Sequence, residues 1–169
     1  GNVHWYRTNS YVLNGFIYVL TNSSLTIEPG TVIRGKAGTG LSSAALFITQ
    51  GAKIYAEGTP HSPIIFTSED DDLDDPNDIP LYTRNLWGGV VIYGQAILNT
   101  ASDGTGNTSS PKYDLFEGLS DDIIAGQHIN RFGGTNDDDN SGVFRYVSLR
   151  YSSTVILPNK EINGLSLCA

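Results

Sequence analysis

The sequence predicts an all-β fold, a right-handed parallel β-helix, that is, a solenoid with coils of about 21 residues and two long loop insertions. The first observation is a repeat with that period: Leu25–Ile33 and Leu46–Ile54 carry Leu, Ile, Gly and Ile at equivalent places. A looser copy follows at 91–97. The second is that apolar residues alternate within each copy, which is typical of a strand with one buried face. The third is the 19 glycines and the lack of any ten-residue amphipathic helix pattern.

A single domain over residues 1–169 is expected, because this length suits one hydrophobic core. Residues 1–24 are predicted to form an N-terminal cap, with aromatic and β-branched runs broken by the turn signal Asn14-Gly15. Trp5 and Tyr6 are expected to cover the open end of the first coil. Residues 25–68 follow as two coils.

Two stretches interrupt the repeat. Residues 69–85 form an acidic insertion, and residues 99–142 form a longer insertion that is rich in Ser, Thr, Gly and Asn at its start. A structureless loop of that length is unusual in a compact domain, so 115–119 and 123–132 are expected to pack on the flank of the solenoid. Strands return at 143–151.

The last apolar strand, 162–167, is predicted to leave an exposed edge that further β-helix coils or another chain would cover. We predict an assembly edge formed by Ile162, Leu165 and Leu167 at this end, with Trp5 at the other. A heterologous contact that does not close produces an open polymer, so end-to-end self-association into a filament is the associated hypothesis.

The formal net charge of −8 and the pI near 4.6 argue against nucleic-acid partners and anionic membranes, and are compatible with divalent cations. The chain has no apolar run long enough for a transmembrane helix, and we expect that any signal peptide has already been removed. It has no Met, so we expect a processed product or an excised piece. The single cysteine, Cys168, excludes an intrachain disulfide.

Much of the chain outside the insertions resembles secreted bacterial surface proteins of the right-handed parallel β-helix type. The segments that carry the resemblance are Tyr11–Val19, Leu25–Gly35, Gly51–Pro60, Pro63–Ser68, Trp87–Ile92, Asn140–Arg150 and Glu161–Leu165. The resemblance implies an extracellular or cell-surface location and no agreed catalytic residues. Members of this group usually continue for more coils beyond the last matching segment.

The acidic stretches are the candidate metal sites, since Ca²⁺ takes six to eight oxygen ligands that loops rich in Asp and Asn supply. The alternative is a solvated acidic loop that keeps a surface protein soluble. Neither stretch fits the EF-hand pattern. The candidate ligands are Asp70, Asp71, Asp72, Asp74, Asp75, Asp137, Asp138 and Asp139, with Glu69 and Asp78 beside them.

A polysaccharide lyase or hydrolase is the competing hypothesis, because many parallel β-helices have such activities. Asp121-Asp122 would be the paired carboxylates of a hydrolase, and Arg145 or Arg150 the base of a lyase. The Gly-His-Gly and paired-Asp motifs of galacturonase-type β-helices are missing, and no histidine lies beside a nucleophile motif. Fold analogy alone does not support an enzyme.

Other candidates remain open. Tyr93, Tyr146 and Tyr151 either line a sugar-binding face or are ordinary strand aromatics, which we favour. Asn22 and Asn107 begin N-glycosylation patterns that also arise by chance. The sequence therefore predicts a non-enzymatic, extracellular structural or adhesion module, with Ca²⁺ and cell-surface glycans as candidate ligands. The alternative is a carbohydrate-binding or polysaccharide-degrading β-helix.

Overall fold

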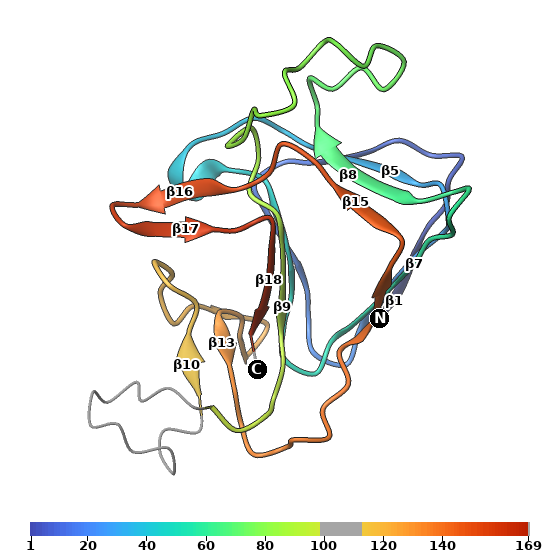
Figure 1. Ribbon diagram of the computed structural model, residues 1–169. Helices are drawn as coiled ribbons and strands as arrows, with labels where there is room; N and C mark the ends of the chain where they lie inside the picture. Colours follow the sequence, from blue (N-terminus) through green and yellow to red (C-terminus); the bar gives the residue numbers. More distant parts are fainter. Residues whose placement is uncertain (99–112, 169) are drawn as a thin grey trace.

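A computed structural model describes residues 1–98 and 113–168, and Asn107 and the start of the long insertion lie outside these ranges. The chain winds through four coils of three short strands, which stack into three parallel four-stranded sheets (Figure 1). Sheet A contains β1 (Asn2–Trp5), β4 (Ser24–Ile27), β7 (Lys53–Glu57) and β14 (Gly142–Arg145). Sheet B contains β2 (Tyr11–Leu13), β5 (Val32–Gly35), β8 (Ile64–Ser68) and β15 (Val147–Leu149). Sheet C contains β3 (Phe16–Val19), β6 (Ala45–Ile48), β9 (Val90–Tyr93) and β18 (Leu165–Cys168).

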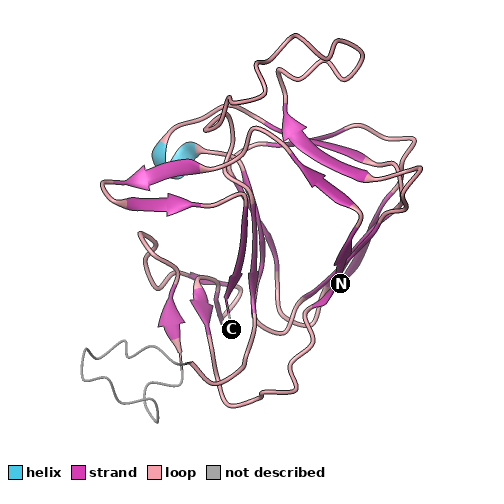
Figure 2. Cartoon of the chain, viewed as in Figure 1, coloured by secondary structure: helices cyan, strands magenta, loops and turns pink. Residues whose placement is uncertain are grey.

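The predicted right-handed parallel β-helix is therefore confirmed, in a nearly all-strand chain (Figure 2). Its interior is filled by alternate residues of every strand. Leu25 pairs with Ile54 and Ile33 with Phe66, and these side chains are at most 2% exposed. Since fully burying a side chain of this size contributes about 1.5–3 kcal/mol, these stacked apolar rows hold the coils together.

The two copies of the sequence repeat do not stack on one another, although the first coil has nearly the predicted length, with Val3 stacked on Leu25. The two copies lie in different sheets: Leu25 belongs to β4 of sheet A, whereas Leu46 belongs to β6 of sheet C. The partners that stack on one another are Val3 with Leu25 and Ile17 with Leu46, and the second pair is more widely separated along the chain than the first. Every strand of a solenoid has the same inside-outside alternation, so the local pattern does not reveal to which side of the coil a strand belongs.

The described part of the insertion between β9 and β14 forms two small antiparallel strand pairs, β10 (Asp114–Leu115) with β13 (Arg131–Phe132) and β11 (Ile123–Ile124) with β12 (Gln127–His128). Its aromatic side chains pack on the outer face of sheet C. Phe116 lies with its ring centroid 6.2 Å from that of Phe47 and 5.9 Å from that of Tyr93. The two central strands of sheet C, β6 and β9, are consequently buried on both faces.

A third insertion, which the sequence did not predict, is the antiparallel hairpin of β16 (Thr154–Leu157) and β17 (Lys160–Ile162). It covers the other part of the outer face of sheet C (Figure 1). The Ser43 hydroxyl lies 3.2 Å from that of Thr154, in a buried contact between the hairpin and the segment after the short 3-10 helix η1 (Gly40–Ser42).

The acidic stretch after β8 is a chain of turns that projects away from the coils (Figure 1). Trp87 follows this acidic stretch and is fully buried. Its indole Nε1 donates a hydrogen bond to the Arg150 carbonyl at 2.8 Å. The ring occupies the space above Gly35, where an added Cβ would lie 2.6 Å from Trp87. This contact fixes where the chain rejoins the solenoid.

Candidate functional site

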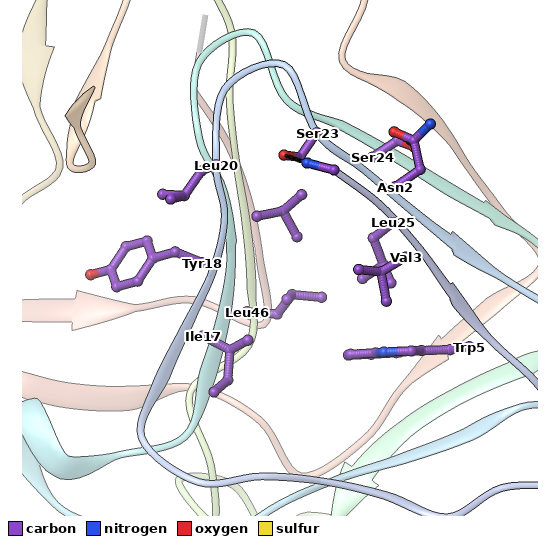
Figure 3. Close-up of a pocket in the computed structure, with 12 residues that line it drawn as sticks. Asn2, Val3, Trp5, Ile17, Tyr18, Leu20, Ser23, Ser24, Leu25 and Leu46 are labelled. Carbon is purple, nitrogen blue, oxygen red and sulfur yellow. Dashed lines mark hydrogen bonds between the residues drawn. The ribbon is translucent and has the colours of Figure 1, made fainter. Parts of the chain in front are cut away.

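The N-terminal end of the solenoid contains the largest cavity that we describe, about 400 Å³ in volume, between β1, β3, β4 and β6. Its walls are mostly apolar: Val3, Trp5, Ile17, Leu25 and Leu46 face one another across it (Figure 3). Trp5 is half-buried and stacks on Tyr11 with ring centroids 4.8 Å apart. The cavity exists because the inward residues of the first coil have neighbours on one side only.

The C-terminal end is formed by β14, β15 and β18, each of which pairs on one side only within the described part of the chain. Two cavities of about 260 and 220 Å³ lie here and share Ile92, Ser141 and Leu167 as lining residues. Leu165 and Leu167 are 38% and 69% exposed although they stand in inward positions of the sheet.

The structure places three of the four predicted assembly residues at the ends: Trp5 at one, Leu165 and Leu167 at the other. The prediction for Ile162 is wrong. Ile162 belongs to β17 and has 0% exposure, because the hairpin folds back and presses this side chain into the cluster outside sheet C. The apolar run that looked like one strand is divided by a turn before β18.

Sequence reasoning missed Val3, Ile17 and Phe144, which stand in inward rows at the two ends. The signal lies in the strand register: Phe144 is opposite Ala56, and Ala56 opposite Ile27. Such rows emerge only once each strand is assigned to its sheet.

The acidic insertion uses its carboxylates to close its own turns. Asp72 Oδ1 accepts the Asp74 N–H at 3.1 Å, Asp75 Oδ1 accepts the Asn77 N–H at 2.9 Å, and Asp78 accepts from Ile79. Asp70 is exposed and its backbone N–H donates to Ser68 Oγ.

Asp71 differs from its neighbours, since it is 5% exposed. Its carboxylate accepts the Thr67 hydroxyl and lies 3.8 Å from the Arg150 guanidinium. This residue anchors the base of the acidic loop to the last coil.

The second acidic stretch is arranged in the same local way. Asp137 Oδ1 accepts the Ile97 N–H at 2.8 Å, and Asp139 Oδ2 accepts the Ser141 hydroxyl at 3.0 Å. Asp138 is exposed. Among residues 1–98 and 113–168, no group of three or more His, Cys, Asp or Glu side chains converges as a metal site would require.

Asp121, proposed as half of a carboxylate pair, is bound instead by Arg131 and His128 on the surface of the long insertion. Arg131 Nε donates to Asp121 Oδ1 at 2.8 Å, and His128 Nδ1 contacts the same oxygen at 2.8 Å. The hydrogen bonds from Arg131, and then those from His128, lower the pKa of the Asp121 carboxyl below its ordinary value. Arg131 also lies over the Tyr113 ring, 3.9 Å from its centroid.

The arginines considered as lyase bases are likewise paired. Arg145 Nη2 lies 2.7 Å from Glu57 Oε2 on the outer face of sheet A, and Arg150 lies beside Asp71. A guanidinium held against a carboxylate stays protonated and is a poor proton acceptor.

The tyrosines fall into different environments. Tyr93 points outward from sheet C but is buried beneath the long insertion, where loss of solvent raises the pKa of its hydroxyl far above its usual range. Tyr146 is 54% exposed in the one-residue corner between β14 and β15, and Tyr151 is half-buried. They share no face.

Four stacked three-sided coils define the protein as a parallel β-helix domain. The family described as "Pectate-lyase like beta helix domain" matches residues 1–169, and the chain belongs to this family. No curated protein and no solved structure matches the chain. In the described ranges, no helix is long and apolar enough to cross a membrane.

Proposed function

We propose that this chain is a non-enzymatic structural or adhesion module of the cell exterior. It acts as a stiff β-helical segment that displays its insertions. The observation that carries the proposal is the continuous apolar interior shared by the stacked coils, from whose outer surface the insertions project. β-Helix domains of this family are typically extracellular, which supports the location.

Stiffness follows from the packing. Each coil contacts the next through three parallel ladders, and the apolar rows inside run through all four coils. Solenoid stability is approximately a sum of such neighbour interfaces, so a coil added at either end extends the same core.

The candidate catalytic groups support a non-enzymatic role. Asp121, Arg145 and Arg150 are each held in an ion pair, and Asp121 and Arg145 lie on exposed surface. An oppositely charged partner already balances the charge of each of these three side chains, and the three side chains do not line one described cavity together.

A screen of the purified chain for lyase and hydrolase activity on acidic and neutral polysaccharides tests this proposal. We expect no turnover, and we expect antibody labelling of intact, unpermeabilised cells that produce the protein. Turnover that Asp121→Asn or Arg145→Ala abolishes would show that the protein is an enzyme, and label found only after permeabilisation would contradict the location.

A second candidate function, carbohydrate binding, is favoured by the outer face of sheet A. None of the outward side chains of sheet A is buried, whereas the insertions cover sheet C. His4 stacks on Tyr6 with ring centroids 4.4 Å apart, next to the His4–Glu28 pair at 3.6 Å. Aromatic faces beside charged hydrogen-bonding groups suit sugar rings.

A glycan array probed with the wild-type chain, Tyr6→Ala and the control Leu157→Ala tests this candidate. Leu157 is 44% exposed on the hairpin, away from sheet A. Carbohydrate binding by this face predicts a signal that Tyr6→Ala removes and Leu157→Ala retains, and an array with no signal rejects it.

A further inference from the structure

We propose that a pocket on the flank of the solenoid binds an alkylammonium group, with the Asp122 carboxylate as its negative partner. The pocket has a volume of about 140 Å³ and lies between β3, the 3-10 helix η1 and the long insertion. It is situated on the outer face of sheet C, outside the apolar interior of the coils. The inference does not depend on the structural role proposed above.

One side of the pocket is aromatic and aliphatic. Phe16 and Tyr18 stand two residues apart in β3, so both side chains lie on the same face of the sheet, and Tyr18 points away from the N-terminal cavity (Figure 3). Their rings pack on Phe47, with centroids 5.1 and 4.9 Å from its own. Leu41 of η1 and Leu119 of the insertion complete the apolar walls, which suit the methylene stem of an alkylammonium group.

A hydrogen-bond network fixes the polar side of the pocket. The Tyr18 hydroxyl donates to Asn130 Oδ1 at 3.2 Å, and Asn130 is only 1% exposed. Asn130 Nδ2 donates to the Ser120 carbonyl at 2.8 Å and to Asp122 Oδ2 at 3.3 Å, so both of its hydrogens are used. Burial, and then the charge of Asp122, raise the pKa of Tyr18 to about 12, so its hydroxyl keeps its proton at neutral pH. The network therefore holds the Asp122 carboxylate beside the aromatic wall.

The charge of the pocket favours a cationic ligand. Asp121 is paired with Arg131 and His128, whereas Asp122 forms no ion pair within residues 1–98 and 113–168. The side-chain donors of Asn130 and Tyr18 are already committed, but the carboxylate can still accept hydrogen bonds.

An ammonium group matches this arrangement, because it has three donors and no acceptor and is attracted to the faces of aromatic rings. An anion would be repelled by Asp122, and a neutral sugar would leave the negative charge without a partner. The lysine side chain of a partner protein and a free alkylamine share the required chemistry.

A titration with n-butylammonium chloride, followed by amide NMR and referenced to sodium chloride at the same ionic strength, tests the proposal. We expect saturable shifts at the amides of Leu41, Leu119 and Asp122. Asp122→Asn retains an oxygen that accepts from Asn130 and should weaken binding about three- to tenfold. The matched control Asp138→Asn removes an exposed carboxylate of the same insertion, outside the pocket, and should bind as wild type does.

Two uncharged ligands, n-butanol and glucose, separate an ammonium site from an apolar crevice and from a sugar site. Shifts of the same amides by either ligand at equal or lower concentration would overturn the proposal. The absence of a saturable shift with n-butylammonium, or unchanged affinity in Asp122→Asn, would overturn it as well.

Nα-acetyl-lysine methylamide distinguishes the source of the ammonium group. Tighter binding than n-butylammonium supports a lysine side chain of a protein partner, and weaker binding supports a free alkylamine. None of these outcomes affects the non-enzymatic proposal, which only polysaccharide turnover or an intracellular location contradicts.

Discussion

The indole of Trp87 lies directly over Gly35, so close that a Cβ on Gly35 would come within 2.7 Å of three of its side-chain atoms. The contact joins the strand β5 to the segment that leads from the acidic loop into β9. It explains why glycine occupies an inward position of a strand, where residues of this type are otherwise disfavoured.

We expect Gly35→Ala to lower the free energy of unfolding by about 1–3 kcal/mol, the usual cost of overpacking a core. Chemical denaturation monitored by Trp fluorescence measures it. Lys36→Ala, at the next and exposed position, is the matched control and should stay within about 0.5 kcal/mol of wild type. Equal stability of both variants would show that Trp87 moves aside at no cost.

Asp71→Asn should destabilise the fold by about 1–3 kcal/mol, because the buried carboxylate accepts the Thr67 hydroxyl and faces Arg150. Asp74→Asn, an exposed change of the same type in the same loop, should have little effect. Thermal melting of both variants makes the comparison. A larger loss of thermal stability for Asp74→Asn than for Asp71→Asn would mean that contacts other than those of Asp71 hold the acidic loop in place.

The Asp121 ion pair predicts a pH dependence of stability. Because hydrogen bonds from Arg131 and His128 lower the folded-state pKa of Asp121, its contribution is present above the unfolded pKa of about 4 and is lost as the pH falls through the folded pKa. Melting midpoints from pH 7 to pH 2 should therefore fall less steeply on the acid side for Asp121→Asn than for wild type. Parallel curves would contradict this assignment. The pair is exposed, so the difference should be small.

Calcium should leave the melting midpoint unchanged. The carboxylates of Asp72, Asp75, Asp137 and Asp139 accept hydrogen bonds from nearby N–H and O–H groups, and the acidic side chains do not converge in the described residues. Melts in chelator and in excess Ca²⁺ should coincide, since a metal that binds only the folded state raises the midpoint. A shift that Asp137→Asn or Asp72→Asn removes would identify the ligands.

The Cys168 thiol should react slowly. Burial raises its pKa from 9.0 to about 11, so at pH 8 the thiolate is about 100-fold scarcer than for an unperturbed thiol. Alkylation followed by mass spectrometry should show this difference between the native chain and the chain in denaturant. Equal rates would indicate that β18 detaches readily from β9.

The apolar alternation at Leu25 and Ile27 predicted the strands and the class of fold. Any strand with one buried face needs an apolar residue at every second position, whichever sheet the strand belongs to. The repeat could not show which strands stack on one another, because Leu25 and Leu46 face the same interior from different sheets. Nor could it predict that Tyr93 lies beneath Phe116, which depends on packing between segments far apart in sequence. Leu165 and Leu167 could be identified because they alternate as apolar residues within the last strand, β18. Ile162 was wrongly assigned to the same strand, because a bend separates β17 from β18.

The growing separation between stacked strands along the chain has a consequence for folding. Val3 meets Leu25 across one short coil, but Ile54 meets Gly142 only after both the acidic and the long insertion have intervened. The second segment is roughly fourfold longer, and each doubling adds about 0.6 kcal/mol of loop-closure entropy, so joining the fourth coil costs about 1.2 kcal/mol more than joining the second. The first coils can therefore nucleate and the last must wait for them, which makes the end that bears Leu167 the last to form and the first to fray in hydrogen exchange.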